Sequence, residues 1–252
     1  MLSKLPVNAL VPMKRALMAP VKKQLFVQHT SNLFVDEYEK VIPSFYVRPA
    51  APILALNGNI GRTGSIQTWA FLSHCSRNWD QTLYVPGALE VGDDNLTHLK
   101  EICDSFRNVK LLNRDTYTCK KHDTIFVGAT LQTGYGNTLL DRYWFLNEFE
   151  TWKSSSSKLV ALTHGVPHQA MLMSNTLSDL DIGELYPVFN AWLSAGIGGK
   201  TIRFRNNVVG SVNGRGTLLG MMRGLPKGWS KSATVRIPEN HEVDEGFVSG
   251  VY

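Results

Sequence analysis

Short apolar runs, separated by polar turns, follow one another along the chain from residue 23 onward. They are rich in Val, Leu, Ile, Phe and Tyr, residues that favour β-strands. Four such runs predict strands: KQLFVQH (23–29), APILALNG (51–58), QTLYVPG (81–87) and KLVALTHG (158–165). The segment 108–130 predicts three short strands with KKHD as a hairpin connection, and the segment 201–216 predicts a hairpin about Asn206–Asn207.

Three segments between these runs have the apolar spacing of amphipathic helices. The first is 63–77, with Thr63 as a possible N-cap and an inward face of Ile66, Trp69 and Ala70. The second is 93–106, with Asp93 and Asp94 at its start and an apolar face of Leu96, Leu99, Ile102, Cys103 and Phe106. The third is roughly 138–153, with an inward face of Leu139, Tyr143, Leu146 and Phe149.

The elements follow a βαβαβ order and then continue as mixed strands and further helices. No internal repeat or linker divides the chain, and 252 residues are enough for one sizeable core. The pattern therefore predicts one α/β domain whose strand-end loops gather at one edge of a sheet.

The ends of the chain differ in composition from this domain. Residues 1–22 contain three prolines and no acidic residue, which predicts an extended basic and apolar arm. We expect the domain to cover 23–216 and a C-terminal tail to cover 217–252. The interrupted apolar residues of the arm do not form the hydrophobic region of a secretory signal, so we expect an intracellular (cytoplasmic) or virion location. No apolar run is long enough to predict a transmembrane segment.

Charge is unevenly distributed around the net value of +5. Five basic residues and no acid precede Asp36, and eight more basic residues lie between Glu184 and Glu239, again without an acid. Such asymmetry is typical of contact with nucleic acid, anionic lipid or an acidic protein. The three cysteines, Cys75, Cys103 and Cys119, form no CxxC pair, so we expect reduced and buried thiols rather than a disulfide framework or a zinc site.

Four strand ends carry the motifs of interest: FVQHTSN (26–32), LNGNIG (56–61), YVPGALE (84–90) and ALTHGVP (161–167). Their order and spacing resemble the calcineurin-like metallophosphoesterases, and FVGATLQT (126–133) and VVGSVNGRG (208–216) extend the resemblance from about Gln24 to Gly216. The resemblance implies a four-layer α/β/β/α sandwich with mixed sheets. It also implies two metal ions at the carboxyl ends of the strands.

The ligand positions of that family are largely substituted in this chain. Set against the family pattern, the positions of its metal ligands and catalytic histidine fall on Gln28, Thr30, Asn59, Ala88, Leu89, His164, Gly196 and Gly198. Among these, the resemblance leaves only His164 with a ligand's identity. Neutral amides are weak partners for a transition metal, and alanine, leucine and glycine offer no ligand side chain. We therefore expect no metal, no cofactor and no two-metal hydrolysis, and we regard these residues as a vestigial pocket.

The leading hypothesis is a catalytically inactive metallophosphoesterase-like protein, a structural or interaction module. We expect protein partners in a larger assembly, such as a virus particle, bound through the arm and the basic C-terminal segment. One alternative is an active metal-dependent phosphoesterase with rearranged ligands: His29, His164, His168 and Asp93 or Asp94. Another is a nucleic-acid-binding protein that uses the basic C-terminal segment. The turn GNIGRTG (58–64) lacks the lysine and serine of a phosphate-binding loop, so we interpret it as a structural turn.

Overall fold

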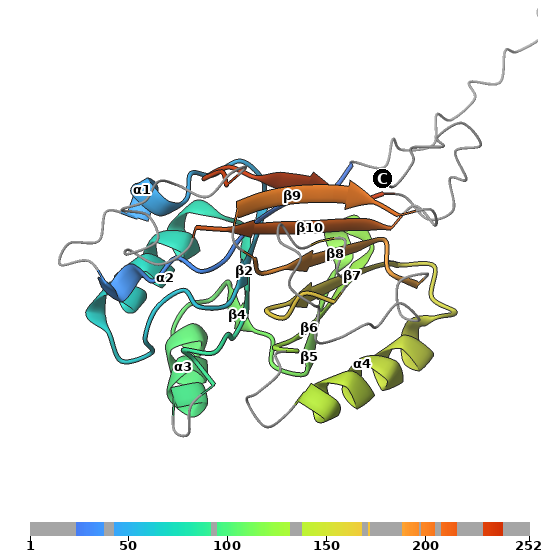
Figure 1. Ribbon diagram of the computed structural model, residues 1–252, viewed down its shortest axis with the longest axis horizontal. Helices are drawn as coiled ribbons and strands as arrows, with labels where there is room; N and C mark the ends of the chain where they lie inside the picture. The colour runs from blue at the N-terminus through green and yellow to red at the C-terminus, as the bar shows by residue number, and fades with distance from the viewer. Residues whose placement is uncertain are drawn as a thin grey trace, which may run out of the picture.

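Two β-sheets lie face to face in the computed structural model, with helices outside them (Figure 1). The structure describes residues 24–37, 43–91, 95–131, 138–167, 171, 188–196, 198–204, 208–215 and 229–238. The arm 1–22 and the turn residues Asn206 and Asn207 therefore lie outside the described residues. Within the described ranges, no helix combines the length and the apolar character needed to cross a membrane.

The first sheet confirms the strands predicted near residues 23–29, 51–58 and 81–87. Its described strands, in spatial order, are β11 (Thr234–Arg236), β1 (Phe26–Thr30), β2 (Ile53–Asn57), β3 (Gln81–Val85) and β4 (Val109–Leu111). Strands β1 to β4 are parallel, whereas β11 is antiparallel to β1, with Val27 opposite Val235. The segment expected to be a tail thus contributes an edge strand to this sheet.

The second sheet contains the remaining strands of the described chain. In spatial order they are β5 (Asp115–Cys119), β6 (Thr124–Ala129), β7 (Lys158–Thr163), β8 (Ala191–Ser194), β10 (Val209–Gly214) and β9 (Gly198–Arg203). The predicted KKHD connection joins the antiparallel strands β5 and β6 through the short 3-10 helix η2 (Lys120–His122). The predicted hairpin is the antiparallel pair β9 and β10, in which Ser211 lies opposite Thr201.

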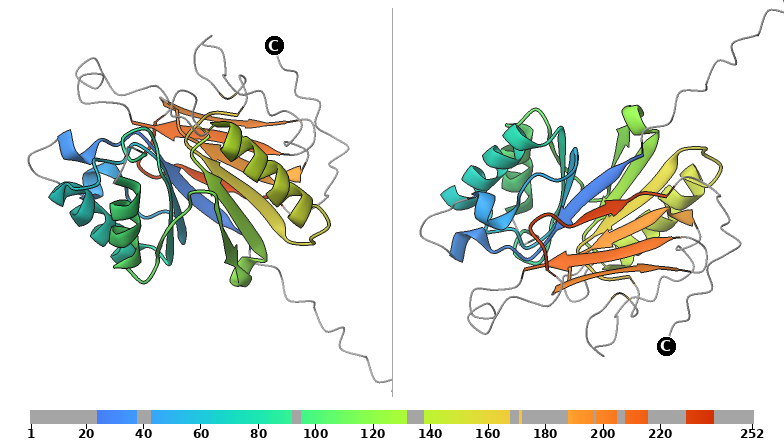
Figure 2. Two further views of the ribbon diagram at one scale, coloured as in Figure 1. Left: turned by 90° about the horizontal axis from the view of Figure 1, so that it is seen from below. Right: turned by 90° about the horizontal axis from the view of Figure 1, so that it is seen from above.

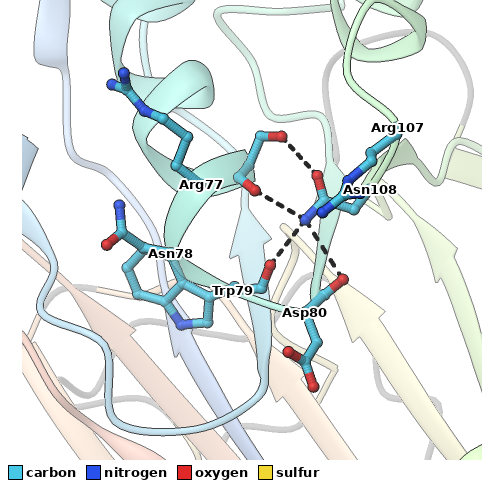
Figure 3. Close-up of a pocket in the computed structure, with 7 residues that line it drawn as sticks. Arg77, Asn78, Trp79, Asp80, Arg107 and Asn108 are labelled. Atoms are coloured by element: carbon cyan, nitrogen blue, oxygen red, sulfur yellow. Dashed lines mark hydrogen bonds between the residues drawn. The ribbon is translucent and has the colours of Figure 1, made fainter.

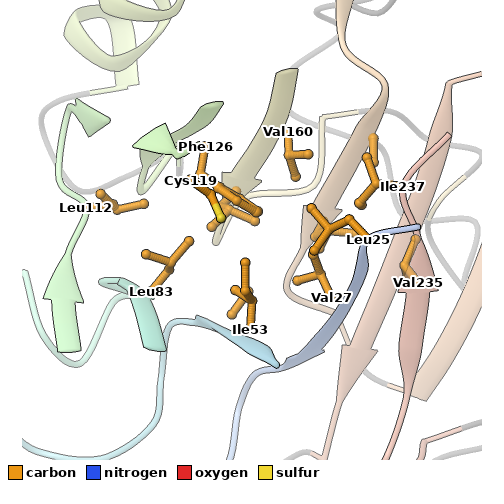
Figure 4. Close-up of a cluster of buried hydrophobic side chains, with 14 of the residues drawn as sticks. Leu25, Val27, Ile53, Leu83, Leu112, Cys119, Phe126, Val160, Val235 and Ile237 are labelled. Atoms are coloured by element: carbon orange, nitrogen blue, oxygen red, sulfur yellow. The ribbon is translucent and has the colours of Figure 1, made fainter. Parts of the chain in front are cut away.

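The main core fills the space between the two sheets. Inward-facing side chains from both sheets meet there, as Figure 4 shows for Leu83, Phe126 and Val160. Strands β6 and β7 are buried along their whole length, because neighbouring strands and the other layers cover them on every side. Such complete burial explains why residues 158–163 read as a nearly continuous apolar run.

Three helices cover the outer face of the first sheet (Figure 2): α1 (Pro43–Tyr46), α2 (Ile66–Asn78) and α3 (Asn95–Asp104). A 3-10 helix, η1 (Val35–Glu37), packs beside α2. On α3 the predicted face is confirmed at four positions, since Leu99 and Cys103 are buried and Ile102 and Phe106 pack against the same cluster. The fifth, Leu96, is half-buried and lies outside the cluster.

The face and the N-cap predicted for α2 are wrong. Ile66 and Trp69 are 72% and 47% exposed, and the buried positions are Thr68, Phe71, Leu72 and Cys75. The N-cap is Ser65 rather than Thr63: the Ser65 hydroxyl accepts a hydrogen bond from the Thr68 backbone N–H at 3.1 Å. The polar Thr68, rather than Trp69, is therefore buried, and its hydroxyl donates to the Arg62 carbonyl oxygen at 3.0 Å.

Helix α4 (Thr138–Trp152) lies on the outer face of the second sheet and is the fourth layer of the sandwich (Figure 2). Its predicted face is only half right. Leu146 and Phe149 pack against the sheet, but Leu139 and Tyr143 are 69% and 65% exposed. The fully buried residue is Phe145, whose ring lies 5.6 Å from the ring of Trp192 on β8. The apolar residues of α4 are distributed around the whole helix, so their spacing in the sequence did not determine which side faces the sheet.

Cys75, Cys103 and Cys119 are buried free thiols, as expected. Burial raises the pKa of Cys75 and raises the pKa of Cys103 to about 12. Neither thiol is therefore a nucleophile at neutral pH.

Candidate functional site at the carboxyl ends of the strands

The parallel strands of both sheets end at the same edge of the sandwich. A parallel bridge between Ser31 and Gly214 joins the two sheets there. The Asn57 side chain at the end of β2 also crosses to the second sheet, where its amide nitrogen donates to the carbonyl oxygens of Thr163 (3.1 Å) and Leu193 (2.9 Å). We call this region the strand-end edge and define it by Asn32, Asn59, Gly87, His164 and Gly196.

A chain of neutral amides spans the strand-end edge. The Asn59 side-chain oxygen accepts the backbone N–H of Leu89 at 3.1 Å, and its nitrogen donates to the Asn32 side-chain oxygen at 3.0 Å. The Asn32 nitrogen in turn donates to the Gly196 carbonyl oxygen at 2.8 Å. The loops after β1, β2, β3 and β8 are thus held together by groups without net charge.

His164 follows β7 and is 7% exposed. Its Nδ1 lies 2.8 Å from the Asn57 carbonyl oxygen. Because a carbonyl can only accept, Nδ1 carries the hydrogen and Nε2 is the unprotonated nitrogen of the neutral ring. Burial lowers the pKa of His164 below its ordinary value, which keeps the ring neutral.

Two glycines permit the close approach of these loops. A Cβ atom at Gly58, where φ is +78°, would lie 2.5 Å from His164 Nδ1. A Cβ atom at Gly87 would lie 2.6 Å from the Asn59 backbone nitrogen. Both distances are far below van der Waals contact, so any other residue at either position would force the loops apart.

Glu90, a residue that the sequence analysis did not select, is the buried anion of this region. Its Oε2 accepts the backbone N–H groups of Asn59 (3.0 Å) and Gly87 (2.8 Å). Its Oε1 accepts the Ile60 N–H and the Tyr84 hydroxyl, both at 2.8 Å. Burial, and next the Glu90 charge, raise the pKa of Tyr84 well above its usual value, so the phenol remains a donor. An acid in the otherwise apolar stretch YVPGALE was the signal for this role.

The backbone N–H groups of the GNIGRTG turn donate hydrogen bonds to the Glu90 carboxylate. Asn59 and Ile60 donate to Glu90. The turn therefore binds an anion, but the anion belongs to the chain itself.

The structure brings together several residues predicted for the vestigial pocket. Asn59, His164 and Gly196 meet at the strand-end edge. Ala88 and Leu89 lie on the same loop as Glu90 and are half-buried. Gly198 begins β9 with φ at +87° and lies opposite Gly214.

Gln28 lies elsewhere. Its side-chain nitrogen donates to the carbonyl oxygens of Arg48 (2.9 Å) and Lys231 (2.8 Å). Its oxygen accepts from Ala50 N and Trp79 Nε1, both at 3.0 Å, on the side of the sheet that carries α2. Thr30 is buried at the end of β1, and its hydroxyl has no hydrogen-bond partner among the described residues. The residue of this segment that contacts Asn59 is Asn32, two positions farther along.

The ligands of the rearranged phosphoesterase are not gathered among the residues that the structure describes. His29 points between the sheets, where its Nε2 lies 2.9 Å from the Ser211 hydroxyl. Burial lowers the pKa of His29 to about 4. His168, Asp93 and Asp94 lie outside the described residues.

The residues present at the strand-end edge do not fit a two-metal centre. No group of three or more His, Cys, Asp or Glu side chains able to hold a metal occurs in the described part of the chain. The amides of Asn32 and Asn59 are neutral and bonded to each other, and Glu90 is already occupied by backbone donors. Two divalent ions require anionic ligands that this set does not supply.

A separate polar hollow of about 420 Å³ lies at the other end of β3, beside the last turn of α2 (Figure 3). The Asn108 side chain joins its walls, because its nitrogen donates to the carbonyl oxygens of Ser76 (3.0 Å) and Trp79 (2.8 Å). Arg77 and Arg107 line its mouth. Asn108 therefore has a structural role there, and the hollow is remote from the strand-end edge.

No protein-family model and no curated protein sequence matches the chain. Solved structures do. TT1561 of Thermus thermophilus superposes with a TM-score of 0.55 at 17% identity, over 76% of this chain and 89% of that one. The phosphopantetheinyl hydrolase PptH of Mycobacterium tuberculosis superposes with a TM-score of 0.57 at 13% identity, over 91% of this chain and 100% of that one. Identities this low establish the fold alone. The chain therefore has the four-layer α/β/β/α sandwich of metallophosphoesterase type.

Proposed function

We propose that this chain is a metallophosphoesterase-fold protein without two-metal catalysis, and that it acts as a structural or interaction module. The observation that carries the proposal is the chain of neutral amides from Leu89 through Asn59 and Asn32 to Gly196. These hydrogen bonds join the loops where the fold would otherwise place metal ligands.

The chemistry of the replacements supports this reading. A two-metal site needs carboxylates and imidazoles to coordinate the ions and to balance their charge. Ala88, Leu89, Gly196 and Gly198 offer no side-chain donor, and His164 contributes a single neutral imidazole. Without bound metal, neither a nucleophilic hydroxide nor charge compensation for a phosphoryl group is available.

The test combines metal analysis with an assay of hydrolysis. We expect the purified protein to contain no stoichiometric transition metal. We also expect no hydrolysis of p-nitrophenyl phosphate or bis-p-nitrophenyl phosphate when manganese is added.

The matched variants are His164→Ala at the strand-end edge and His98→Ala on the exposed face of α3. Two bound metals per chain, or hydrolysis that His164→Ala abolishes and His98→Ala preserves, would overturn the proposal.

The expected working surfaces are the arm and the basic C-terminal segment. The arm combines four basic residues with apolar side chains and no acid, which suits binding along a neighbouring protein surface. This part of the proposal rests on the sequence, because residues 1–22 lie outside the described residues. A large assembly such as a virus particle is the setting that we propose for it.

A further inference from the structure

Strand β9 is an edge of the second sheet. Among the described strands it pairs only with β10, and the alternation of the ladder turns the peptide groups of Gly199, Thr201 and Arg203 away from β10, with no ladder partner among the described residues. An edge of this kind is a template for another extended segment. Native proteins commonly cover or charge such edges.

The end of this edge is basic. Arg203 closes β9 and is exposed, and no described carboxylate forms an ion pair with it. Arg236 on β11 is also exposed, and Figure 2 shows β11 and β9 on the same side of the sandwich. The sequence between Glu184 and Glu239 supplies no acid to neutralise them.

The described chain ends beside Arg203. Pro238 is its last described residue, and the Pro238 carbonyl oxygen accepts from the Asn190 side chain at 3.4 Å. The Asn190 carbonyl oxygen accepts the backbone N–H of Val209 at 3.1 Å, and Val209 lies opposite Arg203 in the ladder of β9 and β10. The described chain therefore stops at the Arg203 end of β9.

The segment that follows is acidic. Residues 239–252 read ENHEVDEGFVSGVY, with four acids in the first half and neither lysine nor arginine. A chain that leaves Pro238 and turns back along β9 runs antiparallel to it. At about 3.3 Å per residue, the fourteen residues reach about 46 Å, enough to cross from Asn190 past β10 to the outer edge of β9 and then to follow its six residues.

We propose that the acidic segment 239–252 binds in cis to the free edge of β9 as an antiparallel strand, with its carboxylates beside Arg203 and Arg236. Main-chain hydrogen bonds would supply the pairing, and the opposite charges would set its position. The inference is independent of the proposed loss of catalysis.

Hydrogen exchange of the full chain tests this directly. The variants are Arg203→Glu, the triple neutralisation Glu242→Gln, Asp244→Gln and Glu245→Gln, and a charge swap that combines Arg203→Glu and Arg236→Glu with Glu242→Lys, Asp244→Lys and Glu245→Lys. The control is Arg107→Glu, an exposed arginine that lines the hollow beside the last turn of α2. Exchange of the β6 and β7 amides reports whether each variant remains folded.

We expect the amides of Thr201 and Arg203, which point away from β10, to exchange at least about tenfold faster in the first two variants and in the wild type at 1 M salt. The charge swap should restore protection, and Arg107→Glu should leave it unchanged. Equal exchange of β9 in all folded variants would overturn the proposal. Protection that disappears on dilution would also overturn it, because the segment would then come from a second copy.

Discussion

Glu90 binds two loops through one buried carboxylate. Replacement by alanine would leave the N–H groups of Asn59, Ile60 and Gly87 and the Tyr84 hydroxyl without their acceptor. Each orphaned buried donor costs about 1–3 kcal/mol, so we expect Glu90→Ala to lower the free energy of unfolding by at least about 3 kcal/mol. Chemical denaturation measures this value.

His164→Ala is the informative comparison for Glu90→Ala. It removes one hydrogen bond, from Nδ1 to the Asn57 carbonyl oxygen, and should cost only about 1–2 kcal/mol. Glu101→Ala, at an exposed position on α3, is the control and should be nearly neutral. If His164→Ala proved more costly than Glu90→Ala, the histidine rather than the carboxylate would organise the strand-end edge.

At the scale of elements, the helices differ in how completely their apolar side chains are buried in the core. Leu99 on α3 is fully buried in the cluster beneath α1, α2 and α3, so we expect Leu99→Ala to cost about 2–5 kcal/mol. Leu139 on α4 is 69% exposed, and Leu139→Ala should change stability by less than about 0.5 kcal/mol. Thermal melts of the two variants check both values, and equal losses would contradict the packing described for α4.

The same contrast shows which elements could be predicted from the sequence. The run 158–163 and the Leu99 stripe could, because a fully buried strand and a one-sided helix leave clear patterns. The face of α2 could not, because it depends on the Ser65 cap and on a bond from the Thr68 hydroxyl to the Arg62 carbonyl oxygen. The spacing of apolar residues cannot reveal a polar residue, such as Thr68, that is buried because its hydrogen bonds are satisfied within the protein.

The strand-end edge was predictable to a similar extent. Asn59 and His164 follow strands that the apolar pattern predicts. Gly196 was located only by setting the family pattern against the chain, because no strand was predicted at Ala191–Ser194. Asn32 and Glu90 could not, because their roles are contacts between loops distant in the sequence, such as the bond from Asn59 to Asn32. Gln28 was selected instead of Asn32 because the family pattern, set against this chain, places its first ligand at Gln28, whose side chain contacts Arg48, Lys231 and Trp79 in the structure.

For the molecule as a whole, the burial of His29 between the two sheets makes the free energy of unfolding depend on pH. His29 on β1 contacts Ser211 on β10, and its pKa falls from 6.5 to about 4 on folding. The neutral His29 contributes fully to the free energy of unfolding above pH 6.5. This contribution is lost as the pH falls toward 4, because the unfolded chain then binds the proton more tightly than the folded protein does. At about 1.4 kcal/mol per pKa unit, we expect a loss of about 3 kcal/mol.

Urea unfolding of the wild type and His29→Asn between about pH 7.5 and 4 measures this dependence. The variant should show a shallower slope but not a flat one, because burial also lowers the pKa of His164. Asp141 has the opposite effect on the pH dependence. Burial raises the pKa of this carboxyl above 3.8, so the cost of burying its charge declines as the pH falls and the group is protonated. His98→Asn is the control variant, and an unchanged slope in His29→Asn would exclude His29 as the origin.

The pairing of β1 with β11 also determines how the chain is completed during synthesis. Ile237 donates to the Leu25 carbonyl oxygen at 2.9 Å, so the first and last described strands are neighbours. At about 5–20 residues per second, a ribosome needs on the order of 10–40 s between making β1 and making β11. Throughout that interval one edge of the nascent first sheet is open to other chains. The nascent protein is therefore most vulnerable to misassembly before β11 emerges from the ribosome.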